Sequence, residues 1–142
     1  MSLLNSLRAL FEGKPAAQQR PAPPPSDPEP EDAQVPELSV EELMAALAGP
    51  IPPLILDVRE PWEWSQAHIP ATESRDVLHI PMNSLPGRLG ELPPGREIAV
   101  MCAHGNRSYG VTHYLVEQGR TARNLTGGIT RWAMAGGETA HG

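Results

Sequence analysis

The chain has 142 residues, a formal net charge of −6 and a single cysteine. This length predicts one folded domain that buries its own core without a disulfide or a structural metal. The lone cysteine excludes an intramolecular disulfide and any multi-cysteine zinc or iron–sulfur site, and the lack of a basic cluster argues against nucleic acid as a partner.

Two further features concern the location of the protein. No apolar run is long enough to span a bilayer, and the first residues lack the basic start and the small-residue cleavage pattern of a signal peptide. A free thiol suits a reducing compartment. We therefore expect a cytoplasmic protein without a transmembrane segment, and the sequence implies no metal ion or organic cofactor.

Residues 1–14 form a short N-terminal segment with an amphipathic pattern. Its apolar side chains recur at helical spacing, namely Leu3, Leu4, Leu7, Leu10 and Phe11. A helix of about ten residues is marginal alone in water. It must therefore dock on a protein partner, a membrane surface or its own domain, or else fray as chain ends do.

Residues 15–36 contain eight of the 17 prolines of the chain. The other residues are mostly Ala, Gln, Glu and Asp, which cannot bury enough apolar surface to fold. We expect an extended, disordered linker here. The folded domain is accordingly predicted over residues 37–142.

Helix and strand patterns alternate through this domain. Ser39 and Glu42 have capping-box spacing before a helix over residues 40–47, and the apolar runs at 54–58 and 97–101 are typical of buried parallel strands. Weaker patterns predict extended pieces at 79–81 and 123–125 and helices at 61–64, 85–89, 108–118 and 129–135. This alternation predicts an α/β domain with a mainly parallel sheet.

Cys102 directly follows the second predicted strand, and the segment C-A-H-G-N-R-S leads from it into a predicted helix. Ligand sites in parallel sheets lie outside the carboxyl ends of the strands. A helix N-terminus offers unpaired amides and a positive dipole end, and a tight turn at Gly105 turns further amides inward. An arbitrary lone cysteine is usually a buried hydrophobe, but this setting favours a thiolate and would also hold a persulfide anion.

The residues after Cys102 form the candidate anion-binding loop. Arg107 adds a fixed positive charge, and Ser108 either caps the helix or turns its hydroxyl into the loop. His104 is equally well explained as a solvated loop residue. The complete predicted loop is Ala103, His104, Gly105, Asn106, Arg107 and Ser108.

Four ordered motifs resemble those of rhodanese-like domains. L-D-V-R-E at 56–60 resembles the D-V-R-E signature, and E-W-S-Q-A-H-I-P at 63–70 resembles E-x-x-x-G-H-I-P, with Ala67 in place of the usual Gly. C-A-H-G-N-R-S at 102–108 resembles the active loop C-x-x-G-x-R-S, and N-L-T-G-G-I-T-R-W at 124–132 resembles the closing G-G-I-x-x-W motif. The resemblance covers residues 37–137, and the segment 71–78 looks longer than usual in small members.

This resemblance implies a rhodanese-like fold with a five-stranded, mainly parallel sheet flanked by helices. It implies that Cys102 is the catalytic nucleophile of a sulfurtransferase, which takes sulfane sulfur from thiosulfate or a persulfide and passes it to a thiol or cyanide acceptor. It makes Asp57 and Arg59 supporting residues near the site, more plausibly as a structural ion pair than as catalysts. For three residues of the closing motif it implies turn and packing roles: Gly127, Gly128 and Trp132.

Two alternatives follow from the same motifs. Cell-cycle dual-specificity phosphatases share the fold, but their loop has five residues between cysteine and arginine, whereas four lie between Cys102 and Arg107. The shorter loop makes a narrower cradle, which fits sulfur better than phosphate. The second alternative is a sulfur carrier or partner-binding module with weak catalysis, which residues 1–36 would target to a protein partner. Ala103 stands where efficient thiosulfate users often carry a cation, so the sequence leaves the donor open.

Overall fold

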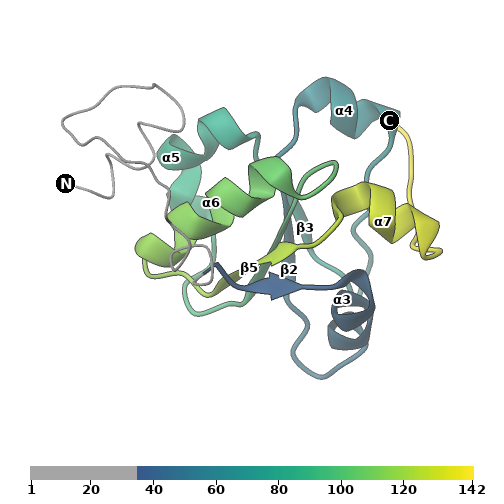
Figure 1. Ribbon diagram of the computed structural model, residues 1–142, viewed down its shortest axis with the longest axis horizontal. Coiled ribbons are helices and arrows are strands. Elements are labelled where there is room, and N and C mark those ends of the chain that lie inside the picture. Colours follow the sequence, from purple (N-terminus) through teal and green to yellow (C-terminus); the bar gives the residue numbers. More distant parts are fainter. Residues whose placement is uncertain (1–34) are drawn as a thin grey trace.

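The computed structural model describes residues 35–142, which form an α/β domain with a central sheet between helices (Figure 1). The sheet has five strands in the order β1-β5-β4-β2-β3, and every neighbouring pair is parallel. The predicted α/β fold with a five-stranded, mainly parallel sheet is therefore confirmed. The strands are β1 (Glu37–Leu38), β2 (Leu54–Asp57), β3 (Val77–His79), β4 (Ile98–Met101) and β5 (Ala122–Leu125).

Helices connect the strands and cover both faces of the sheet. The predicted capping box is present at the first of them, since the Ser39 hydroxyl accepts a hydrogen bond from the Glu42 amide at 3.0 Å and the Glu42 carboxylate accepts one from the Ser39 amide at 2.8 Å. The helices are α3 (Val40–Leu47), α4 (Pro61–Gln66), α5 (Leu85–Arg88), α6 (Asn106–Glu117) and α7 (Gly128–Met134), with short 3-10 turns at Met82–Ser84 and Leu89–Glu91.

Two hydrophobic clusters lie on opposite faces of the sheet, because successive strand residues point to opposite sides. Leu54 and Leu56 of β2 belong to the cluster under α5 and α6. Ile55, between them, belongs to the cluster under α3 and α7. A sheet buried on both faces explains why its central strands are continuous apolar runs.

The parallel arrangement places the carboxyl ends of all strands along one edge of the sheet. Helix α4 and the starts of α6 and α7 gather at this edge (Figure 1). β4 is the middle strand of the order, so the residue after Met101 lies near the centre of that edge. This residue is Cys102.

Two predicted boundaries were wrong, and one strand was not predicted. The extended piece expected at 79–81 lies at Val77–His79, where the backbone pairs with β2. The helix expected from residue 108 begins at Asn106, because Gly105, with a φ of 101°, completes the turn out of the loop. β1 was not predicted, since two residues carry no readable pattern and only pairing with β5 defines them.

The expectations for residues 1–14 and 15–34 lie outside the described residues. Val35 is already buried, and the carbonyl of Pro36 accepts a hydrogen bond from the Asn124 amide at 2.8 Å. Packing against the sheet thus begins slightly before Glu37.

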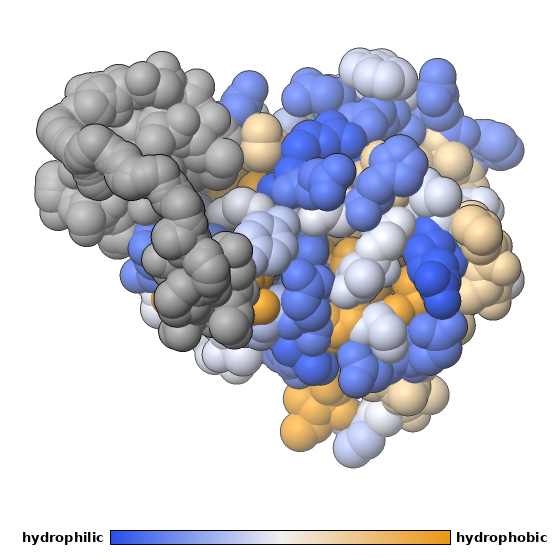
Figure 2. Space-filling view, in the orientation of Figure 1, coloured by the Kyte–Doolittle hydropathy of each residue, from blue (hydrophilic) through white to orange (hydrophobic). Residues whose placement is uncertain are grey.

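The surface in Figure 2 is mainly hydrophilic, with smaller hydrophobic areas toward its centre and lower edge. Large exposed apolar side chains occur on separate elements, as is ordinary for a folded domain: Ile51, Trp62, Val116 and Met134. Over residues 35–142, none of the helices combines the length and the apolar character needed to cross a bilayer.

Candidate functional site

Cys102 lies at the carboxyl end of β4 and is buried, with 1% of its surface exposed. The next residues turn back over the sulfur, and α6 begins at Asn106. The sulfur therefore faces a helix N-terminus, where amides lack partners within the helix and the dipole is positive.

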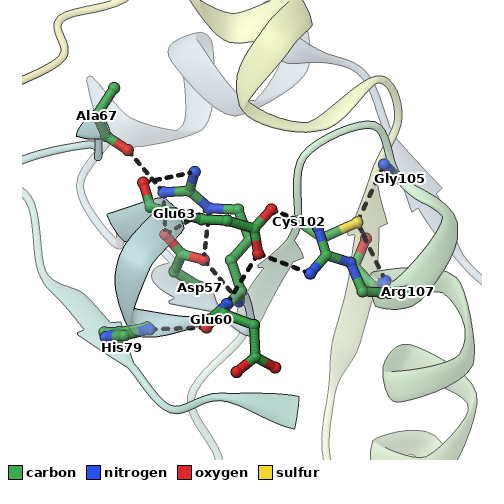
Figure 3. A network of polar contacts seen from close by, with 10 residues as sticks. Asp57, Glu60, Glu63, Ala67, His79, Cys102, Gly105 and Arg107 are labelled. Carbon is green, nitrogen blue, oxygen red and sulfur yellow. Dashed lines mark hydrogen bonds and ion pairs between the residues drawn. The ribbon is translucent and has the colours of Figure 1, made fainter. Parts of the chain in front are cut away.

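Three hydrogen-bond donors converge on the Cys102 sulfur (Figure 3). The amide of Gly105 lies 3.2 Å from it, the amide of Ser108 3.4 Å and the Ser108 hydroxyl 3.3 Å. The loop therefore presents the inward-facing amides that its sequence suggested. Such a ring of donors favours a negative charge on the sulfur.

The carbonyl groups at the start of the loop are held away from the sulfur. The carbonyl of Cys102 accepts a hydrogen bond from the Ile129 amide at 3.0 Å, and that of Ala103 accepts one from the Thr130 amide at 3.2 Å. The first turn of α7 thus binds these carbonyls, which leaves the amides of the loop to face inward.

Gly128 permits this close approach of α7. Its φ is +59°, in the left-handed region, and a Cβ at this position would collide with the carbonyl oxygens of Cys102 and Ala103. The glycine pair of the closing motif therefore docks α7 directly on the cysteine loop.

Two opposing effects act on the pKa of the Cys102 thiol. Burial raises this pKa, whereas hydrogen bonds from the hydroxyl and amide of Ser108 and from the amides of Gly105 and His104 lower it. The hydrogen bonds together prevail, so the pKa of the thiol lies below its ordinary value. The thiolate, which is the nucleophilic form, is correspondingly favoured.

Ser108 does not cap α6, contrary to one of its two predicted roles. It lies within the first turn of the helix, because the helix starts at Asn106. Its hydroxyl instead faces the loop, the other predicted role, and lies 3.3 Å from the Cys102 sulfur and 2.5 Å from the side-chain oxygen of Asn124, so these two acceptors share its single proton.

Asn124 was not singled out from the sequence. Its amide nitrogen donates to the carbonyl of Gly105 and to the carboxylate of Glu37, each at 3.2 Å. These two bonds orient the side chain so that its oxygen points to Ser108. The sequence feature that could have pointed to Asn124 is its place as a polar residue in a buried strand, just before the glycine pair.

Arg107 is paired with Glu63 of α4, in a geometry that holds both groups rigidly. Its two terminal nitrogens each lie 2.8 Å from a different carboxylate oxygen of Glu63. The guanidinium lowers the pKa of Glu63 to about 2, against a smaller opposing effect of burial. Arg107 therefore keeps the positive charge predicted for it, and the ionised carboxylate of Glu63 balances that charge.

Asp57 and Arg59 form a buried ion pair behind α4, 0% and 4% exposed. Arg59 donates to both oxygens of Asp57, with the shortest distance 2.8 Å, and also to the carbonyls of Glu63 at 3.4 Å and Ala67 at 2.8 Å. The pair thus anchors the helix that carries Glu63. Ala67, with a φ of −168°, has an extended backbone that any residue adopts, so the usual glycine is not required there.

An aromatic stack also ties α4 to the sheet. The ring of Trp64 lies between those of His68 and His79, with centroid distances of 4.0 and 4.7 Å. His79 donates a hydrogen bond to the carbonyl of Arg59 at 2.8 Å. Both faces of the Trp64 ring are thereby fixed.

The remaining predicted loop residues lie toward solvent. His104 and Asn106 are exposed, and Ala103 is half-buried. A pocket of about 340 Å³ adjoins this side of the loop and is lined by Glu37, His104, Gly105, Asn106, Tyr109, Asn124, Thr126 and Gly127. Among residues 35–142, no three His, Cys, Asp or Glu side chains come together as a metal site would require.

Comparison with known proteins finds relatives over this folded part. The model of the rhodanese-like domain family matches residues 39–135. A sulfurtransferase of Allochromatium vinosum is 39% identical over 101 residues, which cover 70% of this chain and 90% of the relative. A putative sulfur carrier protein of Bacillus subtilis is 33% identical over 101 residues, and the chain spans about half of it, 52%.

Solved structures agree with these relatives. The crystal structure of a rhodanese-like domain protein from Staphylococcus aureus superimposes with a TM-score of 0.66 at 29% identity, covering 76% of this chain and 99% of that one. Family model, sequence relatives and fold coincide over the same residues. The chain therefore belongs to the rhodanese-like domain family.

Proposed function

We propose that this protein is a sulfurtransferase that carries sulfane sulfur as a persulfide on Cys102. The convergence of three hydrogen-bond donors on one sulfur carries the proposal. Donors that favour a thiolate also favour the persulfide anion made from it. Membership of the rhodanese-like family and the likeness to the A. vinosum sulfurtransferase support the same chemistry.

The first half-reaction loads the cysteine. The Cys102 thiolate attacks the outer sulfur of thiosulfate or of a low-molecular-weight persulfide. With thiosulfate, a sulfur–sulfur bond forms to Cys102, the corresponding bond of the donor breaks, and its electron pair leaves with sulfite. The negative charge then lies on the outer sulfur, where the loop amides and the Ser108 hydroxyl stabilise it.

The second half-reaction unloads the cysteine. A thiolate or cyanide attacks the outer sulfur and releases Cys102 as the thiolate. Because the chain has one cysteine, no second thiol of the same chain resolves the persulfide. We therefore expect ping-pong kinetics with a free acceptor.

The test is the Cys102→Ser variant, compared with the wild type by intact-protein mass spectrometry. Treatment with a sulfur donor should add one sulfur atom to the wild type and none to the variant. Transfer to cyanide or to a thiol should fall to the uncatalysed rate. Sulfur transfer that survived in a folded Cys102→Ser variant would falsify the proposal.

A second candidate is a sulfur carrier or partner-binding module with weak catalysis. The likeness to the B. subtilis protein named a putative sulfur carrier favours it, as does the segment 1–36 with its predicted partner-binding role. In either case we infer a cytoplasmic site of action. A carrier would load one sulfur per chain readily but turn over slowly with small acceptors. Comparing single-turnover loading with multiple-turnover transfer therefore distinguishes a carrier from an efficient enzyme.

A further inference from the structure

Arg107 is the cation of the loop that surrounds Cys102, and its terminal nitrogens are already bound. Both are hydrogen-bonded to Glu63 at 2.8 Å. Figure 3 shows this pair beside the cysteine. The hydrogen bond to Glu63 raises the pKa of Arg107, and burial opposes this rise. The negative charges of Cys102 and Glu60 also raise the pKa of Arg107, so both groups interact with its positive charge.

The carboxylate of Glu63 is fixed where it stands. Its oxygen accepts a second hydrogen bond, from the amide of Glu60 at 2.9 Å, and its side chain is 13% exposed. Its backbone carbonyl accepts a hydrogen bond from Arg59 at 3.4 Å. The guanidinium of Arg107 has five N–H groups, two of which bind Glu63, so an anionic donor that reached the others would still lie beside this fixed carboxylate.

The consequence depends on the charge of the sulfur donor. Thiosulfate carries two negative charges in one small group, and the Arg107–Glu63 pair has no net charge to offer it. A persulfide or a thiosulfonate carries at most one negative charge at its reacting end. Coulombic repulsion by the Glu63 carboxylate is proportional to the charge of the donor, so it acts most strongly on the dianion.

We propose that Glu63 is a specificity-determining residue, which cancels the charge of Arg107 and so directs Cys102 to persulfide donors of low charge rather than to thiosulfate. This inference rests on the proposed function, because it presupposes that Cys102 accepts sulfane sulfur. Glu63 acts through its negative charge, which offsets that of Arg107, and it needs no contact with the reacting sulfur.

Two small donors test the role of charge with the same transferred atom. Thiosulfate and the Cys102 thiolate give the persulfide anion and sulfite, with three negative charges on each side. Methanethiosulfonate and the thiolate give the persulfide anion and methanesulfinate, with two on each side. In both, the donor sulfur–sulfur bond breaks and its electron pair leaves with the sulfur oxyanion.

The experiment measures kcat/KM for both donors in the wild type and in Glu63→Gln, with cyanide as acceptor. We expect Glu63→Gln to raise kcat/KM for thiosulfate by about tenfold, and for methanethiosulfonate by only about threefold, because the charge is halved. Glu63→Asp, which keeps the charge, should keep the wild-type ratio of the two donors. Glu91→Gln, in an exposed pair with Arg88, is the matched control and should leave the ratio unchanged.

Glu60→Gln provides a second variant that leaves the Arg107–Glu63 pair intact, and it should move the ratio toward thiosulfate by less than Glu63→Gln does. An equal change for both donors in Glu63→Gln would overturn the inference. If that variant failed to fold, an unchanged ratio in Glu60→Gln would overturn it instead. If neither donor added sulfur to wild-type Cys102, the proposed function itself would fail, and mass spectrometry separates this outcome from the others.

Discussion

At Cys102, burial and hydrogen bonding act on the same thiol in opposite directions. A sulfur sealed in an apolar interior would remain a thiol, because burial disfavours the charged form. Here the amides of Gly105 and Ser108 and the Ser108 hydroxyl replace the solvent that the sulfur has lost. The residue is therefore buried and yet set up to hold a charge.

Removing the Ser108 hydroxyl should weaken the thiolate. In Ser108→Ala one donor to the sulfur is lost while burial remains, so the pKa of Cys102 should rise. A hydrogen bond to a charged group is worth about 1.5–3 kcal/mol, so kcat/KM should fall roughly tenfold or more. The pH dependence of iodoacetamide alkylation measures the pKa of Cys102. The control is Thr112→Val, which removes a hydroxyl that donates to the Ser108 carbonyl and not to the sulfur. An unchanged alkylation profile in Ser108→Ala would contradict this account.

The Arg107–Glu63 pair should make stability depend on pH in a defined window. The pKa of Glu63 is lowered to about 2 from 4.5, so its contribution is complete above pH 4.5 and is lost as the pH falls through about 2. Arg107 is 34% exposed, so solvent screens the pair and we expect Glu63→Gln to cost only about 1–2 kcal/mol at neutral pH.

Urea unfolding of the wild type and of Glu63→Gln across this range tests the window. The difference between the two proteins should shrink as the pH approaches 2. Glu91→Gln breaks an exposed surface pair and should cause no measurable change. A difference that stayed constant from pH 6 to pH 2 would show that charge is not its origin.

The residues of the site differ in how far the sequence could predict them. Cys102 and its loop were predictable because strand, glycine turn and helix start are consecutive in the chain. The partner of Arg107 was not, because Glu63 lies 44 residues away and only the fold brings α4 to the loop. Asn124 was missed for the same reason, since its three partners come from β1, the loop and α6.

Among the elements, α7 contributes to the site although it holds no predicted catalytic residue. Its first amides bind the carbonyls of Cys102 and Ala103, which sets the direction of the loop peptides. This contact requires the backbones to meet at Gly128.

Gly128→Ala should therefore disrupt both stability and the site. The added Cβ would collide with two carbonyl oxygens and occupy a left-handed conformation, at a cost of about 3 kcal/mol or more. Gly87→Ala is the matched control, because nothing lies within 4 Å of its Cβ position and alanine favours a helix. Thermal unfolding should show a large loss for the first and no loss for the second, and equal melting temperatures would refute the docking role of Gly128.

Elements with strong local signals were predicted well, and those defined by pairing were not. The capping box placed the start of α3 correctly, because Ser39 and Glu42 satisfy each other locally. β3 was placed two residues too late, since its residues are half-buried and only the ladder to β2 defines its bounds. The start of α6 was misjudged because Ser108 was available as a cap but binds the sulfur and Asn124 instead.

At the scale of the whole molecule, residues 35–142 form a core on both faces of the sheet. The described members of the two hydrophobic clusters lie between residues 38 and 132, and β1 forms one edge of the sheet. We therefore expect sulfur chemistry and any targeting by residues 1–34 to be separable by truncation.

Two truncations test this separation. A chain that starts at Val35 should keep the melting temperature and the sulfur loading of the full protein. A chain that starts at Ser39 loses β1, with the buried Leu38 and the Glu37 carboxylate that holds Asn124 and Thr126, so it should unfold at a lower temperature. Burial of one leucine is worth about 1.5–3 kcal/mol, which is a shift of several degrees for a domain of this size. A chain from Val35 that melted as low as the one from Ser39 would show that residues 1–34 belong to the folded core, and activity lost with the N-terminal segment could no longer be assigned to targeting.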